Sequence, residues 1–222
     1  MGMLKRRSLH PSAVVVMGFM GMIAISTLVL LLPISRADAA APPDVMAAFF
    51  TAVSAVCVTG LTVVDTGTYW STFGHAALMV MVQVGGFGMM VSATLLGLWA
   101  ARSMRLRMRV LLQSETRALS MGDVHGVLAA ALITTLAIEL LAALWMTVRF
   151  GWAYGKSWGE ALWLGVFHAV SGFNNAGFSL FPNGLMDFAG DGWMLTPLML
   201  CIVIGGLGFP VLYELWQRLL AM

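Results

Sequence analysis

Long stretches without charge constrain the fold of this chain more than any other feature of its sequence. Five stretches contain no charged residue and a sixth contains only Glu139; they are residues 8–35, 45–64, 66–101, 161–186, 192–213 and 124–148. About 20 apolar residues suffice for a helix to cross a bilayer. Charged residues make up 10% of the 222 residues, against about 25% in soluble domains. The chain is therefore predicted to be an integral membrane protein, which excludes a soluble enzyme and a nucleic-acid-binding protein.

The six apolar stretches are of two kinds. Four are long enough to be helices that cross the membrane: residues 12–34, 72–99, 125–148 and 193–215. Two others, 45–62 and 160–180, are interrupted near their C-terminal ends, by Val58-Thr59-Gly60-Leu61 and by Asn174-Asn175-Ala176-Gly177-Phe178. A helix that stops inside the bilayer leaves carbonyls without partners, which is tolerated only inside protein or beside a cavity. We therefore expect an all-α membrane protein with four crossing helices and two re-entrant pore helices.

The distribution of positive charge predicts the orientation. In a four-crossing arrangement nine of the twelve Lys and Arg residues lie on one side: Lys5, Arg6, Arg7, Arg102, Arg105, Arg107, Arg109, Arg117 and Arg218. Cytoplasmic loops carry this excess, so both termini are expected in the cytoplasm of a multi-pass protein of the cell (inner) membrane. The basic N-terminus and Ala37-Asp38-Ala39-Ala40 also resemble a cleaved secretory signal, but the apolar run exceeds the 7–15 residues typical of one.

An internal repeat divides the chain in two. Residues 50–61 match residues 167–178 at a constant offset of 117, with Phe, Ala, Val, Ser and Gly in register. Gly85-Gly86-Phe87-Gly88 matches Gly205-Gly206-Leu207-Gly208 at an offset of 120. Residues 1–120 and 121–222 are therefore expected to be two copies of one unit: crossing helix, re-entrant helix, extended loop, crossing helix. Because both copies begin on the same side, they are parallel repeats.

Such a unit is suited to binding a cation. A helix that ends at the bilayer centre directs the negative end of its dipole there, and an extended segment after it can offer carbonyls in place of a hydration shell. Gly60 and Gly177 permit backbone angles that are closed to other residues. No carboxylate is required, and neither interruption, 58–61 or 174–178, contains one.

At these residues the sequence resembles the Trk/Ktr family of potassium-uptake proteins, specifically the membrane-embedded ion-translocating subunit. The resemblance rests on the two broken segments and on the closing Gly205-Gly206-Leu207-Gly208-Phe209-Pro210. It implies potassium transport through a filter, with sodium as the other candidate ion. The filter would be lined by backbone carbonyls of Val58, Thr59, Gly60, Asn175, Ala176 and Gly177 and supported by Asn174, Leu61 and Phe178. In the family, glycine at the Gly60 position accompanies potassium preference, whereas some plant relatives that transport sodium have serine.

The resemblance covers only the first half of a family member, because members have four such units around one pore. Either the third and fourth units belong to a longer product, or two copies of this chain supply four loops. The chain ends at Met222, directly after the fourth expected crossing and without a polar tail, which favours the first alternative. The resemblance also implies two further assemblies, a homodimer of the full transporter and a cytoplasmic ring of nucleotide-binding regulatory subunits.

Several other residues have competing interpretations. Glu139 lies in the middle of a crossing helix, where a carboxylate is costly and a functional candidate by default; without an intramembrane cation it is expected to be neutral or bonded to an absent unit. His75 and His168 are expected to have structural partners. No set of residues in the sequence has the spacing of a metal or cofactor site. The glycine runs favour close helix packing. The arginine-rich loop is expected chiefly to set the orientation of the chain in the membrane. The alternative is that it docks the regulatory ring or anionic lipid.

Two other classes of function remain to be compared with transport. An intramembrane enzyme needs paired polar groups on facing helices, and the crossing helices offer no such pair, so we expect no enzyme. A half-length, non-conducting assembly or regulatory subunit is the stronger alternative. Cation flux through the purified chain would separate it from a transporter.

Overall fold

The computed structural model describes residues 11–103, 124–208 and 211, and within them the chain is helical, without a named strand. The α-helices are α1 (Pro11–Leu31), α2 (Val45–Val56), α3 (Thr66–Tyr69), α4 (Thr72–Ser103), α6 (Val124–Ala153), α7 (Trp158–Phe173) and α8 (Gly192–Leu207). Two short 3-10 helices, Pro33–Ser35 and Met186–Phe188, lie in the connections. The predicted all-α membrane class is confirmed at this level.

Three helices in the described part are long and apolar enough to cross a membrane. The qualifying segments are Ser12–Leu31, Thr72–Met89 and Ala131–Ala153, which correspond to the first three expected crossings. The fourth expected crossing begins as α8, a 16-residue apolar helix, and most of the rest of it lies outside the described residues. The arginine-rich loop from 104 onward and the boundary at 120 also lie outside them.

Side chains at the helix ends explain where several elements begin. Asp44 caps α2 by accepting a hydrogen bond from the Ala47 amide, and Ser157 caps α7 through the Glu160 amide. Such caps satisfy amides that have no partner within the helix. Helix α1 ends just before Pro33, as expected because proline disfavours helical backbone in the residue preceding it. Helix α6 runs to Ala153, five residues beyond the predicted end, and so includes Arg149.

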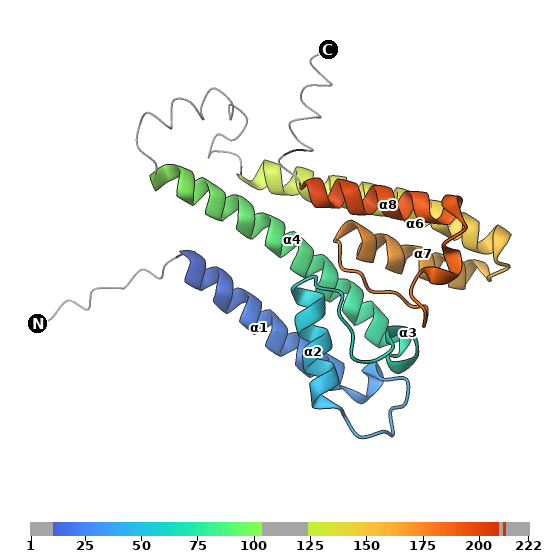
Figure 1. The fold of residues 1–222 in the computed structure, drawn as a ribbon. Helices are drawn as coiled ribbons and strands as arrows, with labels where there is room; N and C mark the ends of the chain where they lie inside the picture. Colours follow the sequence, from blue (N-terminus) through green and yellow to red (C-terminus); the bar gives the residue numbers. More distant parts are fainter. Residues whose placement is uncertain (1–10, 104–123, 209–210, 212–222) are drawn as a thin grey trace, which may run out of the picture.

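The helices form two groups that meet at α4 and α7 (Figure 1). Helices α1, α2 and α4 pack together, as do α6, α7 and α8, and α4 contacts α7. Each group has its own apolar core, one around Leu30, Ala52 and Leu78, the other around Met146 and Phe150. Three residues of the second group, Phe167, Ala176 and Phe178, belong to the first core. The two groups are therefore joined through α7 and the loop that follows it.

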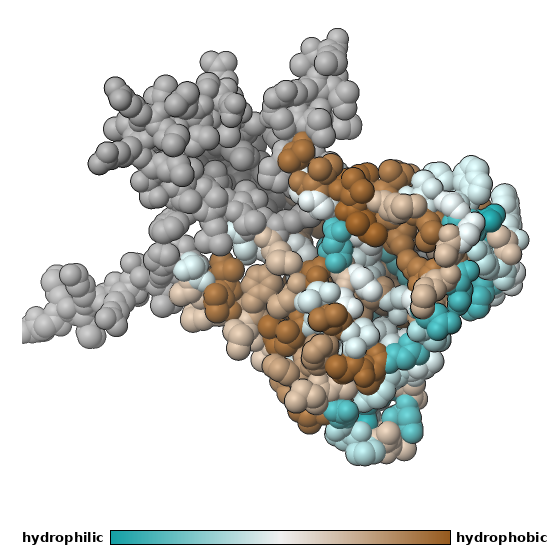
Figure 2. All heavy atoms as spheres, viewed as in Figure 1, coloured by the Kyte–Doolittle hydropathy of each residue, from teal (hydrophilic) through white to brown (hydrophobic). Residues whose placement is uncertain are grey.

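The surface of the helices is strongly apolar. Large hydrophobic side chains stand exposed along α1, α4, α6 and α8, and in Figure 2 hydrophobic surface extends over the helices while hydrophilic residues gather over the loops at the lower and right margins. Only 17% of the apolar window of α1 is buried. This surface suits contact with lipid or with further helices.

Candidate functional site

Helices α2 and α7 end in the same hydrogen-bonded motif. After α2, the Val58 amide donates to the Ala55 carbonyl (3.2 Å) and the Thr59 amide to the Ser54 carbonyl (2.8 Å). The equivalent residues after α7 make the same two bonds, Asn175 to Gly172 (3.0 Å) and Ala176 to Ser171 (2.7 Å). These paired bonds are the Schellman motif, which terminates a helix by reversing the chain direction. Both broken segments therefore stop their helix in the same way, 117 residues apart.

The backbone that follows also repeats. Val58 and Asn175 are the only non-glycine residues with positive φ in the described part of the chain, at 54° and 57°. Two residues later, Gly60 and Gly177 have φ of 76° and 75°. A β-branched residue such as valine is a true outlier in this region. We call residues 57–61 and 174–178 the paired loops, because the two segments share one unusual backbone conformation.

Six carbonyls of the paired loops are free. Among the described residues no donor bonds to the backbone oxygens of the six residues predicted to bind the ion: Val58, Thr59, Gly60, Asn175, Ala176 and Gly177. Each backbone carbonyl has two lone pairs that can accept, so a run of free ones in each loop leaves acceptors available for a ligand.

The structure brings the two loops together. A Cβ atom built on Gly60 would overlap the carbonyl oxygen of Ala176 and lie 3.1 Å from the Gly177 Cα atom. Ala176 is fully buried and Phe178 is 3% exposed, both within the first core, whereas the Leu61 side chain is exposed. Two segments far apart in sequence thus meet at their glycines.

A cavity of about 350 Å³ opens beside the paired loops. Both glycines line it, together with residues from the connection after each loop: Thr62, Val63, Val64, Asp65, Thr66, Ser179, Phe181, Pro182 and Gly184. The cavity therefore lies between the two groups of helices, and both copies of the repeat contribute to its wall.

Asn174, at the start of the second loop, is held by three acceptors. Its Nδ2 atom donates to Val170 O (3.0 Å), to Gln83 Oε1 (3.0 Å) on α4, and to Glu139 Oε1 (3.1 Å) on α6. Glu139 was expected to be neutral or bonded to an absent unit; in the structure it is buried and accepts a hydrogen bond from a neutral amide of this chain. No sequence pattern pointed to Gln83, because one glutamine in an apolar helix belongs to no motif.

Asn175 contacts α8 instead. With its amide oriented to satisfy both ends, the nitrogen donates to the Ile202 carbonyl (3.3 Å) and the oxygen accepts from the Gly206 amide (3.2 Å). The side chain is therefore engaged with a helix, which leaves the backbone carbonyl as the group available in the loop.

Glycines of the two closing runs allow close helix contact, as predicted. A Cβ atom on Gly85 would overlap the carbonyl oxygen of Val56, the last residue of α2. A Cβ atom on Gly205 would overlap the carbonyl oxygen of Phe173, the last residue of α7. Small residues let helices approach closely in membranes. Here each one admits the end of the preceding short helix, so the packing also repeats.

The two histidines have structural partners, as predicted. His168 is 1% exposed; its Nδ1 atom lies 2.7 Å from the Leu164 carbonyl, and its Nε2 atom lies 3.2 Å from Ser179 Oγ. His75 Nε2 lies 2.8 Å from the Thr66 carbonyl. Within the described ranges no group of three or more His, Cys, Asp or Glu could hold a metal.

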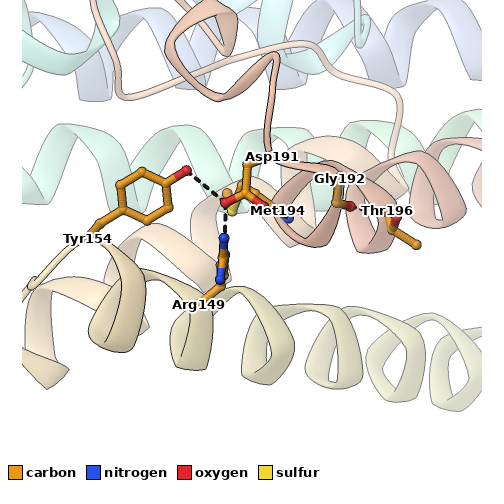
Figure 3. Close-up of polar contacts among 6 residues, drawn as sticks. All are labelled: Arg149, Tyr154, Asp191, Gly192, Met194 and Thr196. Atoms are coloured by element: carbon orange, nitrogen blue, oxygen red, sulfur yellow. Dashed lines mark hydrogen bonds and ion pairs between the residues drawn. The ribbon is translucent and has the colours of Figure 1, made fainter.

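A polar cluster joins the ends of α6 and α8 (Figure 3). Asp191 Oδ2 accepts from Arg149 Nε and from the Tyr154 hydroxyl, both at 2.8 Å, while Oδ1 accepts from the Met194 amide at 3.2 Å. The hydrogen bond from Arg149 is the main reason that the pKa of Asp191 falls to about 2. The cluster fixes the start of α8 against the end of α6.

Apolar helices that are long enough to cross a membrane indicate a helical membrane protein. Comparison with known proteins then places the chain in a family. Residues 3–220 match the family described as TrkH, cation transport protein, and the chain belongs to that family. The predicted family resemblance is therefore confirmed. The family is one of cation transporters and not of enzymes.

Three relatives show the extent of the similarity. The Ktr system potassium uptake protein B of Bacillus subtilis is 38% identical over 94% of this chain and 46% of the relative. A protein of the same name from Vibrio alginolyticus is 32% identical over 92% of this chain and 44% of the relative. The potassium/sodium uptake protein NtpJ of Enterococcus hirae is 31% identical over 97% and 46%. The chain therefore spans about half the length of the relatives that it matches.

Proposed function

We propose that this chain contributes two of the loops that form a potassium-selective filter, and so constitutes half of the pore of a potassium-uptake protein. The repeated backbone of the paired loops carries the proposal, since two segments 117 residues apart share matching φ angles and meet at their glycines. The names of the relatives, which designate potassium or potassium/sodium uptake proteins, support the choice of ion.

The proposed mechanism replaces the hydration shell of the ion with backbone oxygens. Carbonyls of Val58, Thr59 and Gly60, and of Asn175, Ala176 and Gly177, are free to coordinate a bare cation. The C-terminal ends of α2 and α7 add a negative potential next to these carbonyls. No side-chain charge is needed, because carbonyl dipoles supply the field in filters of this kind.

Residues around the paired loops hold the carbonyls in place. We assign support of the second loop to Asn174, through its amide bonds, and to Phe178, through its buried ring. The Phe178 carbonyl also accepts a hydrogen bond from Ser171 Oγ (2.7 Å). Leu61 is assigned the corresponding position in the first loop, where its exposed side chain would pack against a unit beyond this chain.

The membrane arrangement that fits this function has four crossings and two re-entrant helices, α2 and α7. Both termini then lie in the cytoplasm, and the 350 Å³ cavity lies on the outer side of the filter. Residues 1–120 and 121–222 form the two parallel repeats. Two loops coordinate an ion on only half of its perimeter, so a third and fourth unit, or a second copy, is required to complete the pore.

The proposed partners follow from the family. The family resemblance implies that the full transporter is a homodimer associated with a cytoplasmic ring of nucleotide-binding regulatory subunits. The names of the relatives support only that they belong to a Ktr system. The arginine-rich loop is the proposed docking element, with anionic membrane lipid as its other ligand.

Rubidium uptake in a potassium-uptake-deficient bacterium tests the proposal. This chain, joined to the C-terminal half of the Bacillus subtilis relative, should restore uptake that is selective over sodium. Gly60→Ser should lower that selectivity, because a side chain at a positive φ displaces the carbonyls. Gly159→Ala, a helical site with open space around it, should leave the selectivity unchanged. A membrane-inserted assembly that conducts nothing would instead support a non-conducting assembly subunit.

A further inference from the structure

The paired loops share a backbone but differ in how they are held. Asn174 begins the second loop, and the residue at the equivalent position of the first loop is Cys57. The Asn174 amide bonds to two other helices, whereas within the described ranges the Cys57 side chain makes no hydrogen bond and packs against the first apolar core. The second loop therefore has a polar attachment that the first lacks.

This attachment crosses the boundary between the two groups of helices. Gln83 lies on α4 of the first group and Glu139 on α6 of the second, and both accept from the same nitrogen of Asn174, at 3.0 and 3.1 Å. Gly86, one turn from Gln83, leaves the space that the Asn174 side chain occupies, since a Cβ atom there would overlap its Oδ1 atom. The Asn174 side chain therefore occupies space on α4 that is open because Gly86 has no side chain.

Glu139 is buried among neutral groups in the described part of the chain. Glu139 is 5% exposed and Asn174 is 8% exposed. The ion pairs found among the described residues, Arg149 with Asp191 and Lys156 with Glu160, do not include Glu139. Burying a carboxyl in an apolar helix costs free energy unless it is hydrogen-bonded. The contacts that offset this cost are to two neutral amides, that of Asn174 at the start of the second loop and that of Gln83 on α4.

We propose that Glu139 and Gln83 are positioning residues, which act through Asn174 to hold the second loop in the geometry needed for ion selectivity. The two hydrogens of the Asn174 amide are shared among three acceptors, so removing one acceptor leaves both hydrogens bonded. Removing both Gln83 and Glu139 leaves only Val170, on the same helix as the loop. The inference rests on the proposed function for its role in selectivity, but the support of the loop is a separate physical claim.

Hydrogen exchange of the purified chain in lipid nanodiscs tests the support directly. In the double variant Gln83→Leu with Glu139→Leu, one hydrogen of the buried Asn174 side-chain amide has no acceptor, which destabilises the loop that this side chain anchors. The backbone amides of Asn175 and Ala176 should therefore exchange about tenfold faster. The amides of Val58 and Thr59 should be unaffected. Glu139→Gln, which keeps an acceptor oxygen, should retain the protection.

Thr147→Val is the matched control, because it removes a buried oxygen of α6 that bonds only to the Ala143 carbonyl of the same helix. Unchanged exchange at the second loop in the double variant, or equal loosening of both loops by Thr147→Val, would overturn the proposal. If the double variant unfolds, which fast exchange in both loops would reveal, Gln83→Met combined with Glu139→Met takes its place, because methionine has nearly the shape of both side chains and at most a weak acceptor, and it should give the same acceleration confined to the second loop. Exchange that is unchanged there, or that accelerates in both loops alike, would equally overturn the proposal.

Transport by the joined protein then tests the role in selectivity. The double variant should lower the preference for rubidium over sodium and raise the KM for rubidium, with recovery in Glu139→Gln. If the wild-type assembly shows no preference, the proposed function fails while the exchange result stands. If the wild type is selective and the double variant is equally selective, Glu139 and Gln83 have no positioning role.

Discussion

Replacement of Gly60 by alanine separates two physical demands made on this residue. The first is conformational, because φ of 76° is unfavourable for any residue with a Cβ atom. The second is steric, because that Cβ atom would overlap the Ala176 carbonyl of the other loop. Gly155 and Gly177 carry only the first demand, and Gly159 carries neither, so matched substitutions can isolate each contribution.

The magnitudes follow from the surroundings of each glycine. Gly155→Ala, at φ of 63° in open space, should cost only the conformational term, about 1–2 kcal/mol. Gly177→Ala should cost about the same, since its Cβ atom would lie 3.5 Å from the nearest atom, the Gly60 Cα atom. Gly60→Ala should cost a further amount of about 1–3 kcal/mol, because a backbone carbonyl in a packed loop must move. Gly159→Ala in α7 should be neutral or stabilising.

Thermal unfolding of the purified chain in detergent measures these differences. Each kcal/mol should lower Tm by about 2–4 °C in a chain of this size, so Gly60→Ala should unfold clearly below Gly155→Ala and Gly177→Ala. If Gly60→Ala and Gly155→Ala have equal Tm values, Gly60 does not lie against the Ala176 carbonyl, and the inferred contact between the two loops is wrong.

Three further predictions test other parts of the structure. Gly205→Ala should lower Tm by several degrees because the new methyl group meets the last carbonyl of α7, whereas Gly206→Ala, whose methyl group would find its nearest atom at 3.8 Å, should change Tm little. Asp191→Asn should destabilise the chain at neutral pH. The pKa of Asp191 in the folded chain is lowered to about 2 from an ordinary value of about 3.9. The loss of stability relative to wild type should therefore shrink as pH falls from about 4 towards 2, which pH-dependent unfolding measures. A cysteine in place of Asp187 should react with an impermeant thiol reagent added outside intact cells, and one in place of Arg107 should not; labelling of both from outside would contradict the four-crossing arrangement.

The sequence was sufficient to predict the helices because their signal is hydropathy over long windows. Helices α1, α4 and α6 and the shorter α2 and α7 lie where uncharged stretches predict them, and the interruptions coincide with the ends of α2 and α7. The extension of α6 to Ala153 was missed, since Arg149 interrupts the apolar pattern. The structure explains this residue by its bond to Asp191, which satisfies the guanidinium near the end of the helix.

The candidate site was predictable only in part. The repeat located Gly60 and Gly177, because glycine announces a positive φ in the sequence itself. Val58 could not be predicted to be left-handed, since its side chain disfavours that conformation and only the helix-ending hydrogen bonds impose it. Gln83 was missed for a different reason: its role depends on a contact 91 residues away, and no local pattern encodes such a contact.

The two loops also show which features of this site depend on side chains and which do not. At equivalent positions the first loop has Cys57, Val58 and Thr59 where the second has two asparagines and an alanine, yet the positive φ angles of the two loops, 54° and 76° against 57° and 75°, nearly coincide. What the copies share is the pair of helix-ending hydrogen bonds, the glycine that follows, and a glycine on the closing helix that admits the end of the short helix. A site built from carbonyl oxygens requires only these backbone features. The side chains beside them are then free to differ, and in the second loop they form a polar bridge between the two groups of helices.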